Sequence, residues 1–288
     1  MEIAQHYRNS YRKLWFESVV EVNGEIWFSA SNLNGIFRAD RESGESQFVI
    51  NFPHYPNDAL RLYSACVLIK GKIVFAPCSA KDIAVYDIQK NEIKTIELEQ
   101  KIVDQCKSSL FLAAFEYKGF AYLIGAAYPA ILKVDIMNFE IRNITTPFEQ
   151  YRHIESNYDK TFGSSFVIKN DMLYLPILYR NNVLCMDLNT YKCNFLEVLP
   201  QKSRAWDLCI VNDTLLIWGT DFKLSLFNLN TEKIKVFDIE NDTKYEQSGA
   251  FLIPYKNKVM IFRARSKNVI VFDIDTGKVI GELQNINY

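Results

Sequence analysis

The chain has 288 residues, of which 49% are hydrophobic, 14% aromatic and 23% charged. This composition is typical of a folded soluble protein and excludes a disordered or low-complexity chain. Lysine plus arginine (33) and aspartate plus glutamate (34) leave a net charge of −1. This balance argues against binding to nucleic acid or to an anionic membrane surface through bulk charge.

The start of the chain, MEIAQHYRNSYRKLWF, lacks the apolar segment of a secretory signal. The longest uncharged apolar stretch, residues 120–132, is too short to span a bilayer, so we expect no membrane insertion. Six cysteines occur without a CxxC pair, a pattern that favours buried free thiols over disulfides or a zinc site. We therefore expect a cytoplasmic protein without a metal or another cofactor.

A tight turn followed by an apolar run recurs six times along the chain. Successive turns are 43 to 51 residues apart. The turn residues are Gly24, Gly71, Gly119, Asn170, Asp213 and Asn257. Glycine, asparagine and aspartate are the residues that best tolerate the positive φ of a two-residue hairpin turn. The repeat therefore predicts six hairpins.

A second recurring residue follows each of these turns by 15 to 17 positions. It is an acid or an amide: Asp40, Asp87, Asp135, Asp187, Asn228 or Asp273. Such side chains accept hydrogen bonds from the backbone N–H groups of a following turn. We expect this local structural role for all six and no catalytic role.

Each repeat contains two further β-rich runs, one before the hairpin turn and one after the acidic residue, so it reads as four short antiparallel strands. Six such units predict an all-β protein, a six-bladed β-propeller of four-stranded blades in a single domain over residues 1–288. The expected blades cover residues 14–51, 61–99, 108–147, 162–199, 204–239 and 247–286.

The repeats resemble bacterial β-propeller repeats of the WD40-like and quinoprotein-like kind, most closely in NVIVFDIDTGKVIGEL and LSLFNLNTEKIKVF. The resemblance concerns the fold, because the GH and WD dipeptides, the kelch double glycine and the sialidase box are missing. It implies that the innermost strands line a central channel. It also implies that the loops entering them share one face with the loops joining the second and third strands.

Large polar and aromatic residues stand where the chain enters the innermost strands. They are Glu17, Arg61, Tyr63, Lys107, Arg204, Trp206, Asp207, Glu246 and Gln247. Trp206 could stack on a sugar or a base while Arg204 and Asp207 hydrogen-bond to it. Alternatively, Arg204 and Asp207 form a pair that plugs a polar channel.

The loops between second and third strands add candidates on the same face. Their aromatic and basic members, which we expect to be exposed, are Tyr128, Tyr179, Arg180, Phe222, Arg263 and Arg265. Tyrosine, tryptophan and arginine are enriched at binding hot spots, so this face could anchor a partner. Two insertions, residues 50–61 and 148–160, lead into innermost strands as well, and His153 in the second could form an acid–base pair with Glu155 or Asp159.

Two functions of different class follow. The first is a binding propeller whose channel-mouth face recognises a protein partner or a small polar ligand such as a glycan, since no nucleophile, metal-ligand or phosphate-binding motif is recognisable. The ligand-binding candidates are Glu17, Arg61, Tyr63, Tyr128, Tyr179, Arg204, Trp206, Asp207 and Arg263. The second is a propeller hydrolase or lyase with Glu17 and Asp207 as acid and base. A purely structural subunit of an assembly is a third possibility.

Overall fold

The computed structural model describes residues 14–152, 161–240, 249–264, 266 and 268–284. It contains six four-stranded antiparallel sheets, and in each the strands pair in sequence order. The predicted all-β architecture of six four-stranded blades is therefore confirmed. The chain forms two compact units; the first holds the first three blades and the second holds the last three. The expectation of a single domain stays a prediction.

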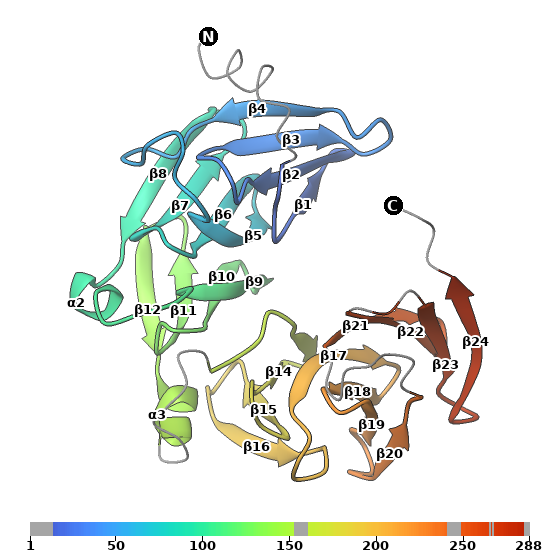
Figure 1. Cartoon of the computed structure of the whole chain (residues 1–288). Coiled ribbons are helices and arrows are strands. Elements are labelled where there is room, and N and C mark those ends of the chain that lie inside the picture. The colour runs from blue at the N-terminus through green and yellow to red at the C-terminus, as the bar shows by residue number, and fades with distance from the viewer. Residues whose placement is uncertain (1–13, 153–160, 241–248, 265, 267, 285–288) are drawn as a thin grey trace. The chain divides into compact units, whose positions relative to one another are not determined.

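Among its described residues the first unit contains twelve strands, which Figure 1 colours from blue to yellow-green. The first blade consists of β1 (Val20–Val22), β2 (Glu25–Ser29), β3 (Ile36–Asp40) and β4 (Ser46–Ile50). The second consists of β5 (Tyr63–Ile69), β6 (Lys72–Pro77), β7 (Asp82–Asp87) and β8 (Glu92–Glu97). The third consists of β9 (Phe111–Tyr117), β10 (Phe120–Gly125), β11 (Ile131–Asp135) and β12 (Glu140–Ile144).

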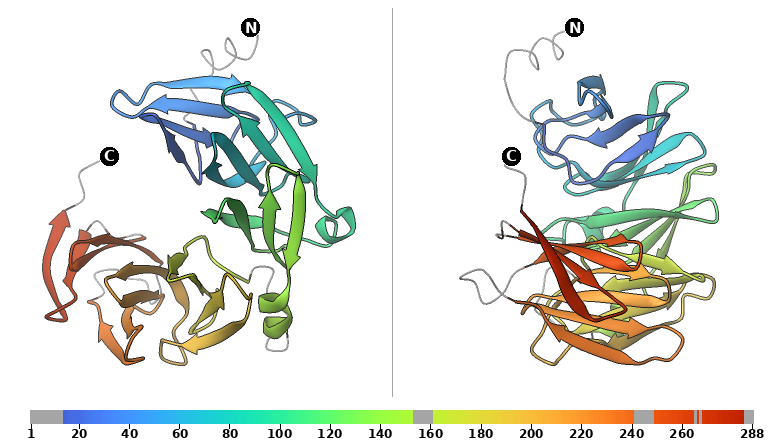
Figure 2. Two further views of the ribbon diagram at one scale, coloured as in Figure 1. Left: turned by 180° about the vertical axis from the view of Figure 1, so that it is seen from behind. Right: turned by 90° about the vertical axis from the view of Figure 1, so that its right-hand side faces the viewer.

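The second unit repeats this pattern. The fourth blade consists of β13 (Val167–Lys169), β14 (Met172–Pro176), β15 (Asn182–Asp187) and β16 (Cys193–Glu197). The fifth consists of β17 (Ala205–Val211), β18 (Thr214–Gly219), β19 (Lys223–Asn228) and β20 (Ile234–Asp238). The sixth consists of β21 (Ala250–Tyr255), β22 (Lys258–Arg263), β23 (Asn268–Asp273) and β24 (Lys278–Gln284). Each sheet is twisted, as the two views in Figure 2 show.

Within the described ranges two short helices interrupt the strands, and neither was predicted from the sequence. They are α2 (Gln100–Val103), which lies between β8 and β9, and α3 (Thr146–Arg152), which follows β12. Within the described part of the chain, no helix is long and apolar enough to cross a membrane.

The hairpin turns follow the sequence pattern with one change. Gly24, Gly71 and Gly119 have φ values of 84°, 75° and 80°, in the region that favours glycine. In the fifth and sixth blades the positive φ falls one residue earlier than expected, at Asn212 and Lys256 instead of Asp213 and Asn257. The turn is still tight, because each of these residues lies between two paired strands.

The six recurring acid or amide residues, which we call the acidic column, have the predicted local role. Asp187 accepts hydrogen bonds from the backbone N–H groups of Asn189 (2.7 Å) and Thr190 (3.2 Å). Asp40, Asp135 and Asn228 also accept two such bonds each from the turn that follows. Asp87 and Asp273 each accept one from the residue three positions further on. These bonds fix the turn between the third and fourth strands.

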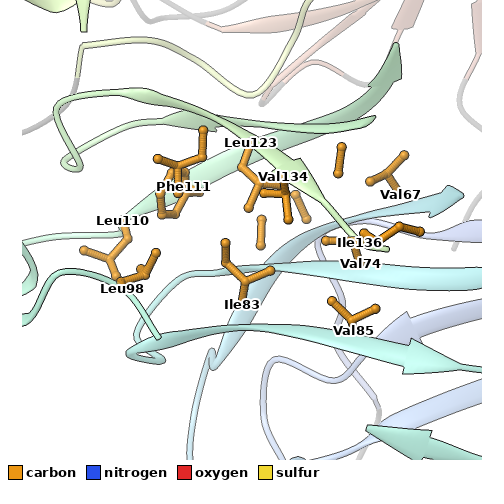
Figure 3. Packing of buried hydrophobic residues seen from close by; sticks show 14 of the residues in the cluster. Val67, Val74, Ile83, Val85, Leu98, Leu110, Phe111, Leu123, Val134 and Ile136 are labelled. Atoms are coloured by element: carbon orange, nitrogen blue, oxygen red, sulfur yellow. The ribbon is translucent and has the colours of Figure 1, made fainter. Parts of the chain in front are cut away.

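The apolar cores lie between neighbouring blades of one unit. In the first unit a cluster joins the second blade, through Val74 and Ile83, to the third, through Phe111 and Leu123 (Figure 3). In the second unit similar clusters join the fourth blade to the fifth and the fifth to the sixth. A middle strand such as β7 is buried on both faces, whereas an outermost strand such as β8 is half exposed.

Candidate functional site

Backbone hydrogen bonds connect the loops at one end of the blades in each unit. In the second unit the N–H of Ala205, where the chain enters the fifth blade, donates to the carbonyl of Arg180 in the loop between β14 and β15 (2.6 Å). The N–H of Thr220, in the loop between β18 and β19, donates to the carbonyl of Arg204 (3.0 Å). In the first unit Arg61 N–H donates to the Ser31 carbonyl (2.8 Å). We call this end the loop face of each unit; it brings together the two sets of loops that the sequence placed on one face.

A β-bulge at the start of β17 determines where Trp206 points. Ala205 pairs with Gly219 and Asp207 with Trp218, so Trp206 is the extra residue on its strand. Bulges change the direction of a side chain and are common beside functional sites. The same irregularity occurs in β5 at Ser64 and in β9 at Leu112. Each of these three bulged residues stands seven positions before its turn residue, whereas the equivalent Ala250 of the sixth blade pairs regularly with Arg263. In the fifth blade the bulge carries an exposed tryptophan (43% exposed).

Trp206 lines a pocket of about 190 Å³ on the loop face of the second unit. The lining residues come from two loops and from the entries to two innermost strands: Leu178, Tyr179, Arg204, Ala205, Trp206, Thr220 and Gly249. We call it the Trp206 pocket. A Cβ on Gly249 would lie 2.5 Å from an indole carbon of Trp206, so the indole packs directly against the glycine backbone. Only glycine leaves room for the indole in this position.

The polar groups of the Trp206 pocket include the guanidinium of Arg204 and the hydroxyl of Thr220. The guanidinium carbon of Arg204 lies 5.8 Å from the centre of the Tyr179 ring, within the range of a cation–π interaction. Thr220 is 8% exposed, and its hydroxyl has no hydrogen-bond partner among the described residues. A buried hydroxyl without a partner is costly, so a hydrogen bond from any group that reaches it, a water molecule or a ligand, would be favourable.

Asp207 stands next to Trp206 but has another environment. Its carboxylate accepts a 2.6 Å hydrogen bond from the backbone N–H of Leu252 on β21, and the residue is 6% exposed. Burial raises the pKa of this carboxyl above its usual value. The expected pair of Arg204 with Asp207 is therefore wrong, because Arg204 lies over Tyr179 while Asp207 binds the neighbouring innermost strand.

Three other candidates are buried where we expected exposure or a place at the channel mouth. The Tyr63 hydroxyl donates to Asp82 (2.5 Å), and desolvation raises its pKa. Tyr128 is 2% exposed, and its ring stacks on Phe111 at 5.0 Å within the core of the first unit. Arg263 is 5% exposed and donates to the Glu240 carbonyl (2.6 Å). The expected exposure of Tyr128 and Arg263 was wrong, because core packing covers the first and a backbone acceptor from another loop binds the second; Phe222, also expected to be exposed, is buried too.

Tyr179 is exposed as expected, Arg204 and Trp206 are exposed as well, and the Trp206 pocket brings the three together. Thr220 and Gly249, which also line the pocket, were not among the residues predicted from the sequence. Thr220 belongs to a loop, GTDFK, that was assigned to this face, but nothing in the sequence shows that its hydroxyl lacks a partner.

In the first unit, Glu17 and Arg61 form an ion pair, with 2.8 Å between Oε1 and Nε. Glu17 stands seven residues before Gly24, the repeat position that Trp206 occupies in the fifth blade. Glu17 and Asp207 belong to different units, so the acid–base pair expected from them stays a prediction.

The insertion at residues 50–61 has a structural role at Tyr55. Its hydroxyl accepts a bond from Lys81 N–H (2.8 Å) and donates to Asp82 (3.1 Å), and burial raises its pKa to about 12. In the second insertion residues 148–152 belong to α3, and His153, Glu155 and Asp159 lie outside the described residues. Arg265, Glu246 and Gln247 lie outside them too.

No protein-family model matches the chain, and no curated protein is similar to it. Many solved structures are similar in fold. A streptogramin B lyase structure superposes with a TM-score of 0.67 at 16% identity, covering 96% of this chain and 84% of the lyase chain. The structure of U3-55K gives 0.65 at 9% identity, covering 96% and 84% of the two chains. The fold is a β-propeller.

A variant of KlHsv2, with loop 6CD replaced by a Gly-Ser linker, is similar as well, with a TM-score of 0.61 at 9% identity over 96% of this chain and 83% of that one. The resemblance to propeller repeats that the sequence indicated is thereby confirmed at the level of the fold. At these identities the likeness carries no information on the ligand.

Proposed function

We propose that this protein is a binding propeller that recognises a small polar ligand, of the glycan type, in the Trp206 pocket. The observation that carries the proposal is the exposed indole of Trp206 beside a cation and an unpartnered hydroxyl. An indole stacks on the apolar face of a sugar ring, while Arg204 and Thr220 can hydrogen-bond to sugar hydroxyls. The pocket volume of about 190 Å³ suits a single ring better than a long chain.

The alternative function, a hydrolase or lyase with Asp207 as acid or base, is less well supported than a binding function. It needs Asp207 as an acid or a base, but that carboxylate is buried and already accepts the Leu252 N–H. A general acid or base must reach the reacting atom within hydrogen-bond distance. For this reason we place the pocket in a binding role.

The test is a titration of the purified chain with a panel of mono- and oligosaccharides, measured by isothermal titration calorimetry. We expect saturable binding that the Trp206→Ala variant weakens about tenfold or more, since stacking contributes on the order of 1–3 kcal/mol. The matched control is Trp15→Ala, because Trp15 is also exposed (67%) but belongs to the first unit and does not line the pocket. Thr220→Val, which keeps the shape and removes the hydroxyl, is expected to weaken binding without lowering the melting temperature.

Binding that survives in Trp206→Ala would contradict the proposal. If no saccharide binds, the other candidate is a protein partner on the same loop face. Exposed tryptophan, tyrosine and arginine are the residue types enriched at binding hot spots, and Trp206, Tyr179 and Arg204 are of these types. Loss of a captured partner in Trp206→Ala, but not in Trp15→Ala, would then identify that interaction.

A further inference from the structure

The first unit has a pocket of its own on its loop face, with a volume of about 450 Å³. Its walls come from the entry to β5, the loop between β6 and β7, and the segment between α2 and β9. The lining residues are Leu60, Arg61, Cys78, Ser79, Val103, Cys106, Lys107, Ser108, Ser109 and Leu110. We call it the Arg61 pocket. Its only charged lining groups are the side chains of Arg61 and Lys107, and three serines stand beside them.

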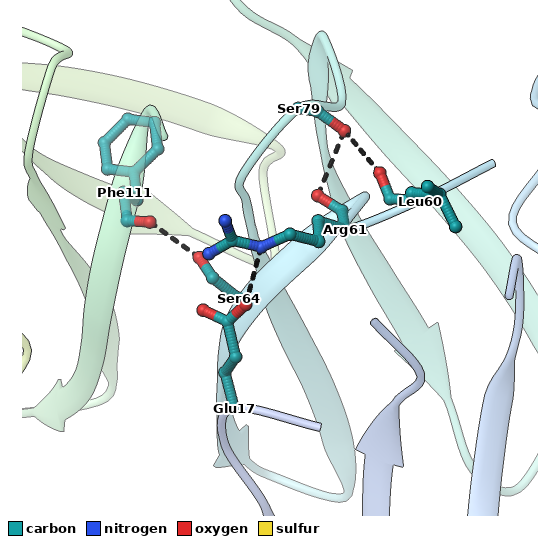
Figure 4. A network of polar contacts seen from close by, with 6 residues as sticks. All are labelled: Glu17, Leu60, Arg61, Ser64, Ser79 and Phe111. Carbon is teal, nitrogen blue, oxygen red and sulfur yellow. Dashed lines mark hydrogen bonds and ion pairs between the residues drawn. The ribbon is translucent and has the colours of Figure 1, made fainter. Parts of the chain in front are cut away.

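The backbone of Arg61 is held firmly on the loop face. Its N–H donates to the Ser31 carbonyl (2.8 Å), and its own carbonyl accepts from the N–H (3.1 Å) and the hydroxyl (3.0 Å) of Ser79. Figure 4 shows the bond from the Ser79 hydroxyl together with the second one that it makes to Leu60. These bonds fix where the Arg61 side chain leaves the backbone, and the orientation of its head group depends on the contacts of the guanidinium itself.

The guanidinium of Arg61 is oriented but not saturated. Its Nε–H donates to Glu17 (2.8 Å), as Figure 4 shows. Neither terminal amino group hydrogen-bonds to any residue within the described ranges, so four N–H donors remain at the open end of the side chain. The bond to Glu17 is also the first cause that raises the pKa of Arg61, so the group stays charged.

Lys107 adds a second positive charge to the pocket wall. It is exposed, and it forms no ion pair with any residue that the structure describes. Glu17 offsets one of the two cations, so the local balance is one positive charge. A fixed guanidinium with free terminal amino groups binds two oxygens of a planar or tetrahedral anion side by side, and a nearby ammonium strengthens this attraction.

We propose that the Arg61 pocket binds an oxyanion, the carboxylate or phosphate group of a small ligand, between the terminal amino groups of Arg61 and the ammonium of Lys107. Glu17 acts as an internal counter-ion that orients the guanidinium and competes with the ligand for it. The site is separate from the Trp206 pocket and does not rest on the function proposed for that pocket.

The test is isothermal titration calorimetry of the whole chain at pH 7 with inorganic phosphate and, separately, with succinate. We expect saturable binding that weakens as ionic strength rises. Arg61→Gln and Lys107→Gln are expected to weaken it about tenfold and several-fold, respectively. Lys101→Gln is the matched control, because Lys101 is an exposed lysine on α2 that does not line the pocket.

The two probes distinguish the sources of the anion. Binding of phosphate alone assigns a phosphate ligand, binding of succinate alone assigns a carboxylate, and binding of both supports the shared oxyanion site. Glu17→Gln, which keeps an acceptor for Nε–H but removes the competing charge, is expected to tighten binding several-fold. The proposal is overturned if neither probe saturates, if Lys101→Gln weakens binding as much as Arg61→Gln, or if Glu17→Gln leaves it unchanged or weaker.

Discussion

The carboxylate of Asp207 on β17 accepts a hydrogen bond from the backbone N–H of Leu252 on β21, the innermost strand of the next blade. In the first unit the Ser18 hydroxyl accepts one from Cys66 N–H in the same way, at 3.2 Å. Ser18 and Asp207 each stand six residues before their turn residues, so the two bonds are equivalent in the repeat. An innermost strand pairs with its own sheet on one side only, and a side chain from the preceding blade satisfies an N–H on its free edge.

The first prediction concerns the charge of Asp207. Asp207→Asn keeps an oxygen for Leu252 N–H and removes a buried charge, so we expect the free energy of unfolding at pH 7 to be unchanged or higher. Asp207→Ala leaves the N–H without a partner and is expected to cost about 1–3 kcal/mol. Urea denaturation of the three proteins measures both changes. Equal losses for Asn and Ala would contradict this account.

The pH dependence of the same variants gives a second readout. The pKa of Asp207 is raised in the folded state by burial, so its contribution to stability is complete below the unfolded pKa of about 3.9 and is lost as pH rises through the folded pKa. We therefore expect the stability of the wild type relative to Asp207→Asn to fall between acidic and neutral pH. If the stability of the wild type relative to Asp207→Asn instead rises with pH, the pKa of Asp207 is not raised by burial.

The second prediction concerns the acidic column, where Asn228 provides a natural comparison. Asp40 accepts the N–H of Ser43 (2.7 Å), and Asn228 accepts the equivalent N–H of Thr231 (2.9 Å). Asp40→Asn should therefore be tolerated, whereas Asp40→Ala loses the bonds and should lower the melting temperature. Thermal unfolding followed by circular dichroism tests this, and equal melting temperatures for both variants would show that the bonds contribute nothing.

For Asp40 the sign of the pH effect is opposite to that of Asp207. The backbone N–H of Ser43 is the first cause that lowers its pKa. A lowered folded pKa gives a contribution that is present above the ordinary value and is lost as pH falls through the folded pKa. The advantage of the wild type over Asp40→Ala should consequently shrink in strong acid, and an advantage that persists there would count against a role for the carboxylate charge.

The third prediction uses the close approach of Gly249 to Trp206. In Gly249→Ala the new Cβ would lie 2.5 Å from the indole, so the ring must move. We expect acrylamide to quench the Trp206 emission more strongly and the pocket to bind its ligand more weakly. The loss of stability should be only about 1 kcal/mol, because the ring is partly exposed. Gly163→Ala is the control, since its Cβ would make ordinary contacts at 3.5 Å. Unchanged quenching in Gly249→Ala would mean that the indole does not rest on this glycine.

The fourth prediction concerns the buried carboxylate of Asp82. Tyr63→Phe removes the 2.5 Å bond to it within the core and should cost about 1–3 kcal/mol of stability. Tyr86→Phe is the matched control: the ring is buried as deeply, but its hydroxyl donates to Asn91 at a turn, so the expected cost is within about 0.5 kcal/mol. Chemical denaturation compares the two, and a larger loss in Tyr86→Phe would contradict the reasoning.

The repeat and its turns could be predicted from the sequence because their causes are local. A residue with positive φ such as Gly71, and an acid such as Asp187 beside its own turn, act within a few positions of the chain. The burial of Tyr128 could not be predicted, since it depends on packing against Phe111 from another segment. The bulge at Trp206 could not be predicted either, because no sequence pattern indicates an extra residue within a strand.

The main-chain bonds across the loop face have an evolutionary consequence. Contacts such as Ala205 N–H to the Arg180 carbonyl do not depend on which side chains the two residues carry. Mutation can therefore exchange the residues that meet a ligand without dismantling the frame that holds them. One blade arrangement can thus acquire a new specificity by a few substitutions at positions such as 61, 179, 204 and 206, and a library randomised at these four positions should retain a large fraction of folded members.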